Sequence, residues 1–491
     1  MKMTRSQLYR RIEQAEPGEI AKLEMQIAVC PWRQSYHIQP VTGLLNDPNG
    51  FSYYNGYYHL FYQWFPLGTE HGMKYWYHTR SRNLVDWENI GIAIEPGGRY
   101  DSHGAYSGSA VEKDGRLNMI YTGNTRDENW IRHPYQCLAV MDEENVVTKY
   151  EQPVIREVPS GYTEHFRDPK VWQRGDAYYC VIGAQRTDKT GCTVLYRSVD
   201  LKQWQFLGEI NTRYPALGYM WECPDYIELD GQGVLIFSPQ GIQAEEDLYQ
   251  NIYQSGYLMG PPLNLETRAF AHGDFQELDR GFDFYAPQTM LSPDGRRILV
   301  AWMGLPDLAY PTDNSGWAHC ITIPRQLSIQ DNKLIQQPVA EMEQLRREKQ
   351  GISAKVRLDD ECKAVAHFHG ITYELECEIQ LKGAERIGIE FRASATEKTV
   401  IQYNRLQHKL ILDRSQSGAA LSEANGTIRQ CTLKADVIQL RMFVDSSSVE
   451  LFVNNGQEVF TSRIFPSCDS TDIRFFAYGG RAEFSAVKWD Y

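Results

Sequence analysis

The chain has 491 residues, of which 42% are hydrophobic and 23% charged, which is typical of a globular protein with two domains. Its formal net charge is −13 and it has no long run of Lys or Arg, which argues against a nucleic-acid partner or an anionic membrane surface. The N-terminal stretch lacks the apolar core of a signal peptide, and no window reaches the roughly 18 apolar residues of a membrane span. The ten cysteines include no C-x-x-C pair, so we expect a cytoplasmic protein with reduced thiols and no zinc site.

A helical pattern opens the chain. Residues 4–27, from Thr4 as a possible cap to Leu23, are polar with loosely spaced apolar positions, which predicts a helical lead-in over 1–35 that packs on the outside. From residue 36 the chain consists of short segments rich in β-branched and aromatic residues and bounded by Gly, Asn and Asp, which predicts strands.

Two-residue turn signals recur at intervals of about sixty residues. They are Asn55-Gly56, Asp114-Gly115, Gly175-Asp176, Asp230-Gly231 and Asp294-Gly295. Each suits the closure of a β-hairpin, and each unit is long enough for four strands. The pattern predicts a five-bladed β-propeller over residues 36–335. The alternative is a chance recurrence of common hairpin turns.

The pattern changes after residue 335. A short polar stretch over 336–350 is typical of a helical linker, and alternating strands over 351–491 predict a C-terminal β-sandwich. The predicted fold is therefore all-β, a five-bladed propeller followed by a sandwich. The sandwich carries no chemical motif of its own, and its face is a candidate surface for a homodimer.

Three carboxylates occupy similar places in three of the repeated units. Asp47 and Asp168 are each followed by proline, and Glu222 is followed by Cys223 and a proline. Each acid lies about seven or eight residues ahead of a hairpin turn. Because the innermost strand of each blade lines the propeller axis, we expect the three acids to converge at one mouth of the channel.

Carboxylates that face one bond are what glycoside hydrolysis requires. Asp47, among amide donors, is expected to stay ionised and act as the nucleophile. Glu222 follows Trp221 and has acidic neighbours, so its pKa is expected to rise toward that of a general acid, whereas Arg167 should hold Asp168 ionised. The sequence contains no His/Cys metal constellation, phosphate loop or Gly-x-Ser-x-Gly elbow that would favour other chemistry.

Residues 46–50, 167–169 and 222–223 resemble the three signature motifs of glycoside hydrolase family 32, the invertase and fructan-hydrolase family. Residues 61–63, 106–110 and 282–286 resemble further motifs of that family, and 316–317 with 323–325 resemble its propeller-closing segment. The resemblance implies a retaining mechanism on β-fructofuranosides, with Asp47 as nucleophile, Asp168 as transition-state stabiliser and Glu222 as acid/base. It implies no metal and no organic cofactor.

The resemblance also implies a set of residues that contact the sugar. They are Asn46, Gln63, Tyr106, Ser107, Arg167, Tyr285 and Trp317. Tyr106 stands where the family usually has Trp or Phe. Leu44 stands where the family often has Trp, and His71 where a pocket-wall Trp is common. The departures at Leu44 and His71 concern the leaving-group side of the pocket.

A cytoplasmic enzyme needs an imported substrate, which favours sucrose 6-phosphate over sucrose or short fructo-oligosaccharides. Four cations are expected near the rim of the first two blades and are candidates for binding phosphate: Lys74, Arg126, Arg132 and His133. Ordinary solvated surface charge is the alternative for these side chains. A sugar-binding propeller without catalysis is a further alternative, which the presence of all three acids disfavours.

Overall fold

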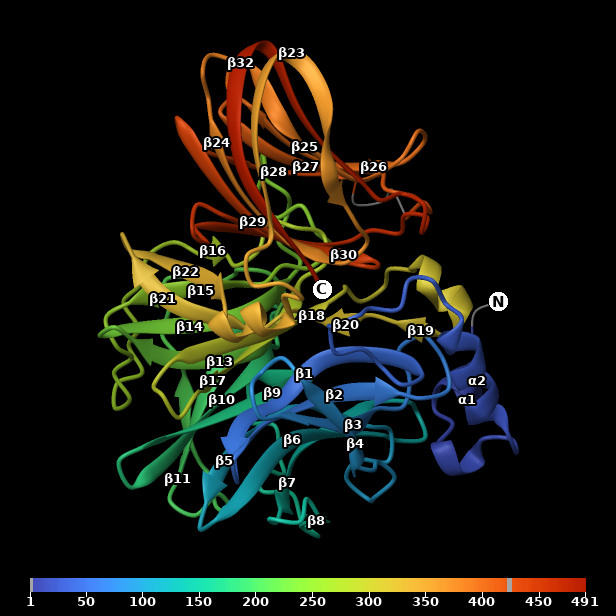
Figure 1. Cartoon of the computed structure of the whole chain (residues 1–491). Helices are drawn as coiled ribbons and strands as arrows, with labels where there is room; N and C mark the ends of the chain where they lie inside the picture. Colours follow the sequence, from blue (N-terminus) through green and yellow to red (C-terminus); the bar gives the residue numbers. More distant parts are fainter. Residues whose placement is uncertain (1–2, 422–425) are drawn as a thin grey trace.

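The computed structural model describes residues 3–421 and 426–491. Figure 1 shows a five-bladed propeller, coloured blue to yellow, with the orange and red C-terminal sandwich on one side of it. The predicted all-β fold is confirmed. The helices near the N-terminus are α1 (Arg5–Leu8), η1 (Ile12–Gln14) and α2 (Glu19–Ala28). Within the described ranges, no helix combines the length and apolar character needed to cross a membrane.

Each blade is an antiparallel sheet. The first comprises β1 (Gly43–Tyr54), β2 (Tyr57–Phe65), β3 (Tyr75–Ser81) and β4 (Trp87–Ile94), and the second β5 (Ala105–Lys113), β6 (Arg116–Arg126), β7 (Arg132–Met141) and β8 (Val147–Lys149). The third comprises β9 (Tyr162–Arg174), β10 (Ala177–Arg186), β11 (Gly191–Ser198) and β12 (Gln205–Glu209). The fourth comprises β13 (Met220–Leu229), β14 (Gln232–Gln240), β15 (Gly256–Gly260) and β16 (Gln276–Glu277). The fifth comprises β17 (Tyr285–Leu291), β18 (Arg297–Met303), β21 (Arg325–Gln330) and β22 (Lys333–Pro338).

The predicted turns close the first hairpin of each blade. Asn55 and Gly56, between β1 and β2, have φ of 47° and 78°, and Asp230 and Gly231, between β13 and β14, have 50° and 77°. A hairpin loop of two left-handed residues matches the twist of the strands it joins, and Asn, Asp and Gly adopt that conformation most readily. These short-range signals explain why the blade count could be predicted.

The inner strands form a closed ring, because β1 contacts β5 and β17, β9 contacts β5 and β13, and β13 contacts β17. The segment β19 (Trp317–Ala318) pairs in parallel with β1, while β20 (Cys320–Ile321) pairs with β18. The segment after the fifth blade's second strand therefore also holds the first blade, and this closes the propeller. A short helix, η2 (Pro311–Ser315), precedes it.

A β-bulge interrupts the inner strand of every blade at the same level. The last residues paired before each bulge are Asn46, Ala105, Arg167, Glu222 and Tyr285. A bulge leaves residues unpaired and re-aims the side chains around it. Asp47 and Asp168 lie within their bulges, whereas Glu222 is the last paired residue of its strand. The expectation of three acids at one equivalent position is thus wrong by one residue for Glu222.

The sandwich follows η3 (Ala340–Leu345) and forms the C-terminal part of the molecule. Its strands are β23 (Ile352–His369), β24 (Tyr373–Gln380), β25 (Arg386–Ala393), β26 (Lys398–Asn404), β27 (Lys409–Gln416), β28 (Ile428–Thr432), β29 (Val437–Asp445), β30 (Ser448–Val453), β31 (Glu458–Arg463) and β32 (Asp472–Asp490). The long strand β32 pairs with β23, β24 and β25, and their inner faces enclose one apolar core.

Buried charges join the sandwich to the propeller. Arg325 pairs with Glu450 at 2.6 Å and with Asp279 at 3.0 Å, and His37 lies 2.7 Å from Asp445 and 3.0 Å from Glu450. Burial opposes a charge on His37, but bonds to Asp445 and Glu450 outweigh it and raise its pKa to about 9. These contacts connect residues before the first blade, the fifth blade and the sandwich.

Candidate active site

A cavity of about 260 Å³ lies where the inner strands converge. Its lining includes eleven of the predicted site residues: Asn46, Asp47, Gln63, Lys74, Tyr106, Arg126, Arg132, Arg167, Asp168, Glu222 and Tyr285. The bulges turn side chains from separate blades toward one space. All three acids therefore meet in one pocket.

Asp47 is held by hydrogen bonds on both carboxylate oxygens. Ser107 Oγ donates to Oδ2 at 2.5 Å, Gln63 Nε2 donates to Oδ2 at 3.1 Å, and Asn46 Nδ2 donates to Oδ1 at 3.1 Å. Burial raises the pKa of Asp47, the Ser107 bond opposes that rise, and the charge of Glu222 adds to it. The donors fix the orientation of the carboxylate, as a nucleophile requires.

Glu222 is surrounded by donors. Arg167 donates from Nε and Nη2 to Oε1 at 2.9 and 2.5 Å, Tyr285 Oη donates to Oε2 at 2.6 Å, and Gln240 Nε2 donates to Oε2 at 2.8 Å. Burial alone would raise the pKa of Glu222, but the charge of Arg167 and the hydrogen bonds from Tyr285 and Arg167 together outweigh burial and hold that pKa below its ordinary value. The predicted rise in the pKa of Glu222 is therefore wrong.

Asp168 also differs from the prediction. Its Oδ2 lies 4.0 Å from Arg167 Nε, and its closest donor is the backbone N–H of Cys223 at 3.0 Å. Burial raises the pKa of Asp168 to about 7, Arg167 opposes the rise, and the charges of Glu222 and Asp47 add to it. Arg167 pairs with Glu222 in the next blade rather than with its neighbour in sequence.

Lys74 lies inside the pocket instead of at its rim. The residue is 3% exposed, and its Nζ donates to Asn46 Oδ1 at 2.6 Å. Burial lowers the pKa of Lys74 to about 7, against the opposing charge of Asp47. Because Asn46 accepts from Lys74 through its oxygen, its amide nitrogen is turned toward Asp47. Lys74 thus belongs to the nucleophile's surroundings.

Two more of the four predicted phosphate-binding cations, Arg126 and Arg132, line the same pocket. They are partners across the β6–β7 ladder, so their side chains leave the hairpin together. His133, the next residue along, points elsewhere and lies 3.1 Å from Asp127 Oδ2. Adjacent residues of a strand face opposite sides, which explains why Arg132 reaches the pocket and His133 does not.

Trp317, predicted to bind substrate, has a different place. It is fully buried in β19, its Nε1 donates to Cys30 Sγ at 3.3 Å, and Arg33 stacks over its ring at 4.7 Å. Through its backbone pairing with β1, Trp317 helps to close the propeller, and its side chain contacts the lead-in. The sequence pattern identified the closing segment but not the direction of this side chain.

Sequence reasoning missed several lining residues, which are Tyr9, Gly72, Gln240, Tyr253, Trp302, Pro306 and Asp307. Gln240 pairs with Met220 at the far end of the β13–β14 hairpin. Counting outward from the turn at Asp230 along both strands would therefore have placed Gln240 close to Glu222. Tyr9 follows α1 in the segment expected to pack on the outside. No local sequence pattern predicts the contact of Tyr9 with the second blade.

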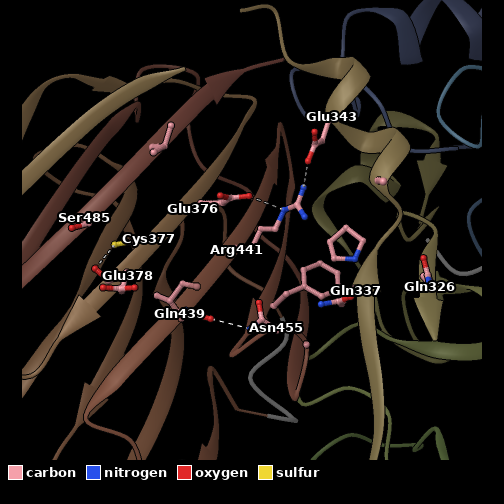
Figure 2. Close-up of a pocket in the computed structure, with 16 residues that line it drawn as sticks. Gln326, Gln337, Glu343, Glu376, Cys377, Glu378, Gln439, Arg441, Asn455 and Ser485 are labelled. Carbon is pink, nitrogen blue, oxygen red and sulfur yellow. Dashed lines mark hydrogen bonds and ion pairs between the residues drawn. The ribbon is translucent and has the colours of Figure 1, made fainter. Parts of the chain in front are cut away.

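A larger cavity of about 530 Å³ lies between the propeller and the sandwich. Figure 2 shows Arg441 there between Glu343 and Glu376, at 3.9 and 3.4 Å, and Asn455 bonded to Gln439. None of the predicted site residues lines it. In the described part of the chain, no group of three or more His, Cys, Asp or Glu side chains is arranged to hold a metal ion.

Comparison with known proteins agrees with this geometry. Residues 37–338 match the family described as glycosyl hydrolases family 32 N-terminal domain, and residues 341–490 match its C-terminal counterpart. The chain is 45% identical over 487 residues to a sucrose-6-phosphate hydrolase of Staphylococcus xylosus, covering 99% of this chain and 98% of that one.

Solved structures show the same relationship. A sucrose-6-phosphate hydrolase from Lactobacillus gasseri superposes with a TM-score of 0.92 at 39% identity, covering 100% of this chain and 99% of that one. A β-fructofuranosidase of Bombyx mori superposes with a TM-score of 0.83 at 33% identity, covering 98% and 99%. The similarity thus extends over both domains.

Proposed function

We propose that this chain, which belongs to glycosyl hydrolase family 32 and cleaves β-fructofuranosides, acts on sucrose 6-phosphate and releases glucose 6-phosphate and fructose. Similarity over the full length to a sucrose-6-phosphate hydrolase supports this choice. The structural observation that carries it is the pair Arg126 and Arg132.

Arg126 and Arg132 have no acidic partner among the residues that the structure describes. Throughout residues 3–421 and 426–491, no carboxylate forms an ion pair with Arg126 or Arg132, although both line the pocket with the three acids. Burial lowers the pKa of Arg132, and the neighbouring charge of Arg167 lowers it further. Two neighbouring cations repel each other, and a phosphate dianion would neutralise both and accept from both guanidinium groups.

The reaction follows from the arrangement of Asp47 and Glu222. An Asp47 oxygen forms a bond to C2 of the fructosyl group while the bond from C2 to the glucosyl oxygen breaks, and Glu222 gives its proton to that oxygen. In the second step a water oxygen bonds to C2, the bond to Asp47 breaks, and the water proton passes to Glu222. Asp168 accepts hydrogen bonds from the sugar while positive charge develops in the ring.

The location follows from the substrate. A sugar phosphate carries two charges and does not cross a hydrocarbon layer, so its hydrolase must act in the compartment where the phosphate is added. We therefore place the enzyme in the cytoplasm, with a small phosphorylated sugar as its partner.

The experiment compares sucrose 6-phosphate with sucrose in Arg132→Gln and Arg126→Gln. Loss of one charged hydrogen bond should lower kcat/KM for sucrose 6-phosphate roughly ten- to a hundredfold and leave sucrose within about twofold. Arg174→Gln removes an arginine that pairs with Glu228 far from the pocket, and serves as the matched control. Equal losses of kcat/KM on both sugars would show that the two arginines do not recognise the phosphate.

A further inference from the structure

The segment that carries Tyr9 is docked onto the first blade. Leu8 accepts from the backbone N–H of Met73 at 2.7 Å, and Ile12 donates from its backbone N–H to Tyr75 Oη at 2.9 Å. At Gly72 a side chain would not fit, since a Cβ atom there would lie 2.2 Å from the Leu8 carbonyl oxygen. The close approach of two backbones thus requires a glycine at this point.

The same segment is also docked onto the second blade. The Arg5 guanidinium lies 4.3 Å over the ring of Trp130, and the Tyr9 ring meets Trp130 edge-on at 5.2 Å. Trp130 belongs to the connection between β6 and β7, which carries Arg126 and Arg132 at its two ends. The segment therefore bridges the first blade to the hairpin that carries Arg126 and Arg132.

Tyr9 lines the catalytic pocket together with those arginines and Tyr106. Burial raises the pKa of Tyr9 to about 12, Tyr106 adds to the rise, and the charges of Arg126 and Arg132 oppose it. The phenol is thus a proton donor at neutral pH. A third cation here would repel the two guanidinium groups, whereas a neutral hydroxyl adds a donor without adding charge.

We infer that Tyr9 donates a hydrogen bond to the phosphate of sucrose 6-phosphate beside Arg126 and Arg132, so that the N-terminal segment determines specificity for the phosphorylated sugar. This inference rests on the proposed function and extends the substrate site beyond the propeller. The phosphate lies away from the bond that breaks, so its contacts have equal strength in the ground state and the transition state. Such contacts change KM rather than kcat.

The test is Tyr9→Phe in the full chain, which removes one oxygen and keeps the ring against Trp130. We expect kcat/KM for sucrose 6-phosphate to fall about tenfold, mostly through KM, and the value for sucrose to stay within about twofold. Inhibition by glucose 6-phosphate should weaken by a similar factor, while inhibition by glucose should not change. Tyr54→Phe removes a hydroxyl that donates to the Gly115 carbonyl outside the pocket, and is the matched control.

The outcomes separate this inference from the proposed function. If Arg132→Gln lowers the preference for sucrose 6-phosphate and Tyr9→Phe does not, the phosphate assignment stands and the role of Tyr9 is refuted. Equal losses on both sugars in Tyr9→Phe would also refute it, because they would indicate a structural role. A native enzyme that does not prefer the phosphorylated sugar would overturn the proposed function and this inference with it.

Discussion

Arg167 donates two hydrogen bonds to Oε1 of Glu222, at 2.9 and 2.5 Å, although it precedes Asp168 in the chain and lies 4.0 Å from that carboxylate. The pairing lowers the pKa of Glu222, whereas burial raises the pKa of Asp168 to about 7, so Asp168 is the carboxyl that retains a proton to higher pH. Glu222 must nevertheless supply a proton to the leaving group. We infer that sugar hydroxyls that donate to Asp168 favour its ionised form. The proton held by Asp168 then moves to Glu222.

Asp168→Asn tests this distribution of the proton. In the native enzyme kcat/KM should decline as the pH rises through about 7, where the buried acids lose their shared proton. The amide of the Asp168→Asn variant cannot hold that proton, and it carries no negative charge to raise the pKa of Glu222. The decline in kcat/KM should therefore move to lower pH. The maximal rate should fall roughly a hundred- to a thousandfold. An unchanged pH profile in the variant would show that Asp168 does not share the proton.

Glu222→Gln tests the two-step reaction. With sucrose 6-phosphate kcat/KM should fall roughly 10²- to 10⁴-fold, because no acid protonates the leaving oxygen. A 4-nitrophenyl β-fructofuranoside needs no such proton, so it should give a burst of nitrophenolate equal to the enzyme concentration, followed by slow release of fructose. Asp47→Ala should give no burst. A burst in Asp47→Ala would mean that another group is the nucleophile.

Lys74→Met tests whether Lys74 supports the nucleophile Asp47 or binds the phosphate. Without the ammonium group the Asn46 amide is free to turn, and the pKa of Asp47, already raised by burial, rises further. We expect kcat/KM to fall about tenfold or more for both sucrose 6-phosphate and sucrose, and the acidic limb of the profile to move to higher pH. A loss confined to the phosphorylated sugar would instead restore Lys74 as a phosphate ligand.

His37→Ala tests the joint between the domains. The substitution leaves Asp445 and Glu450 without their buried cation, which should lower stability by about 3 to 5 kcal/mol. Because the pKa of His37 is raised to about 9, its contribution is complete below pH 6.5 and is lost as the pH rises through 9.

Calorimetry should therefore show the largest drop in unfolding temperature for His37→Ala near pH 6, with a smaller difference at pH 9. His133→Ala, which removes an exposed histidine, should leave the transition in place. A drop of the same size at both pH values would contradict a charged His37.

The blades and the pocket could be predicted because their signals are local. Asn55 and Gly56 adopt the turn that their own backbones favour, and acids beside prolines mark the bulged inner strands. The pairing of Arg167 with Glu222 depends on the angle between two blades, which no spacing along the chain encodes. The position of Tyr9 depends on the docking of the lead-in against Gly72, a tertiary contact with no periodic pattern.

Specificity for the phosphorylated sugar is decided by kcat/KM of the native enzyme for sucrose 6-phosphate, sucrose and 1-kestose, with Asp47→Ala as the blank. Two guanidinium groups without carboxylate partners in the described structure predict at least a tenfold preference for the phosphorylated sugar. Equal or faster hydrolysis of sucrose or 1-kestose would contradict the proposed specificity for sucrose 6-phosphate. The enzyme would then be a hydrolase of unphosphorylated fructosides, and Arg126 and Arg132 would be ordinary cations of the pocket wall.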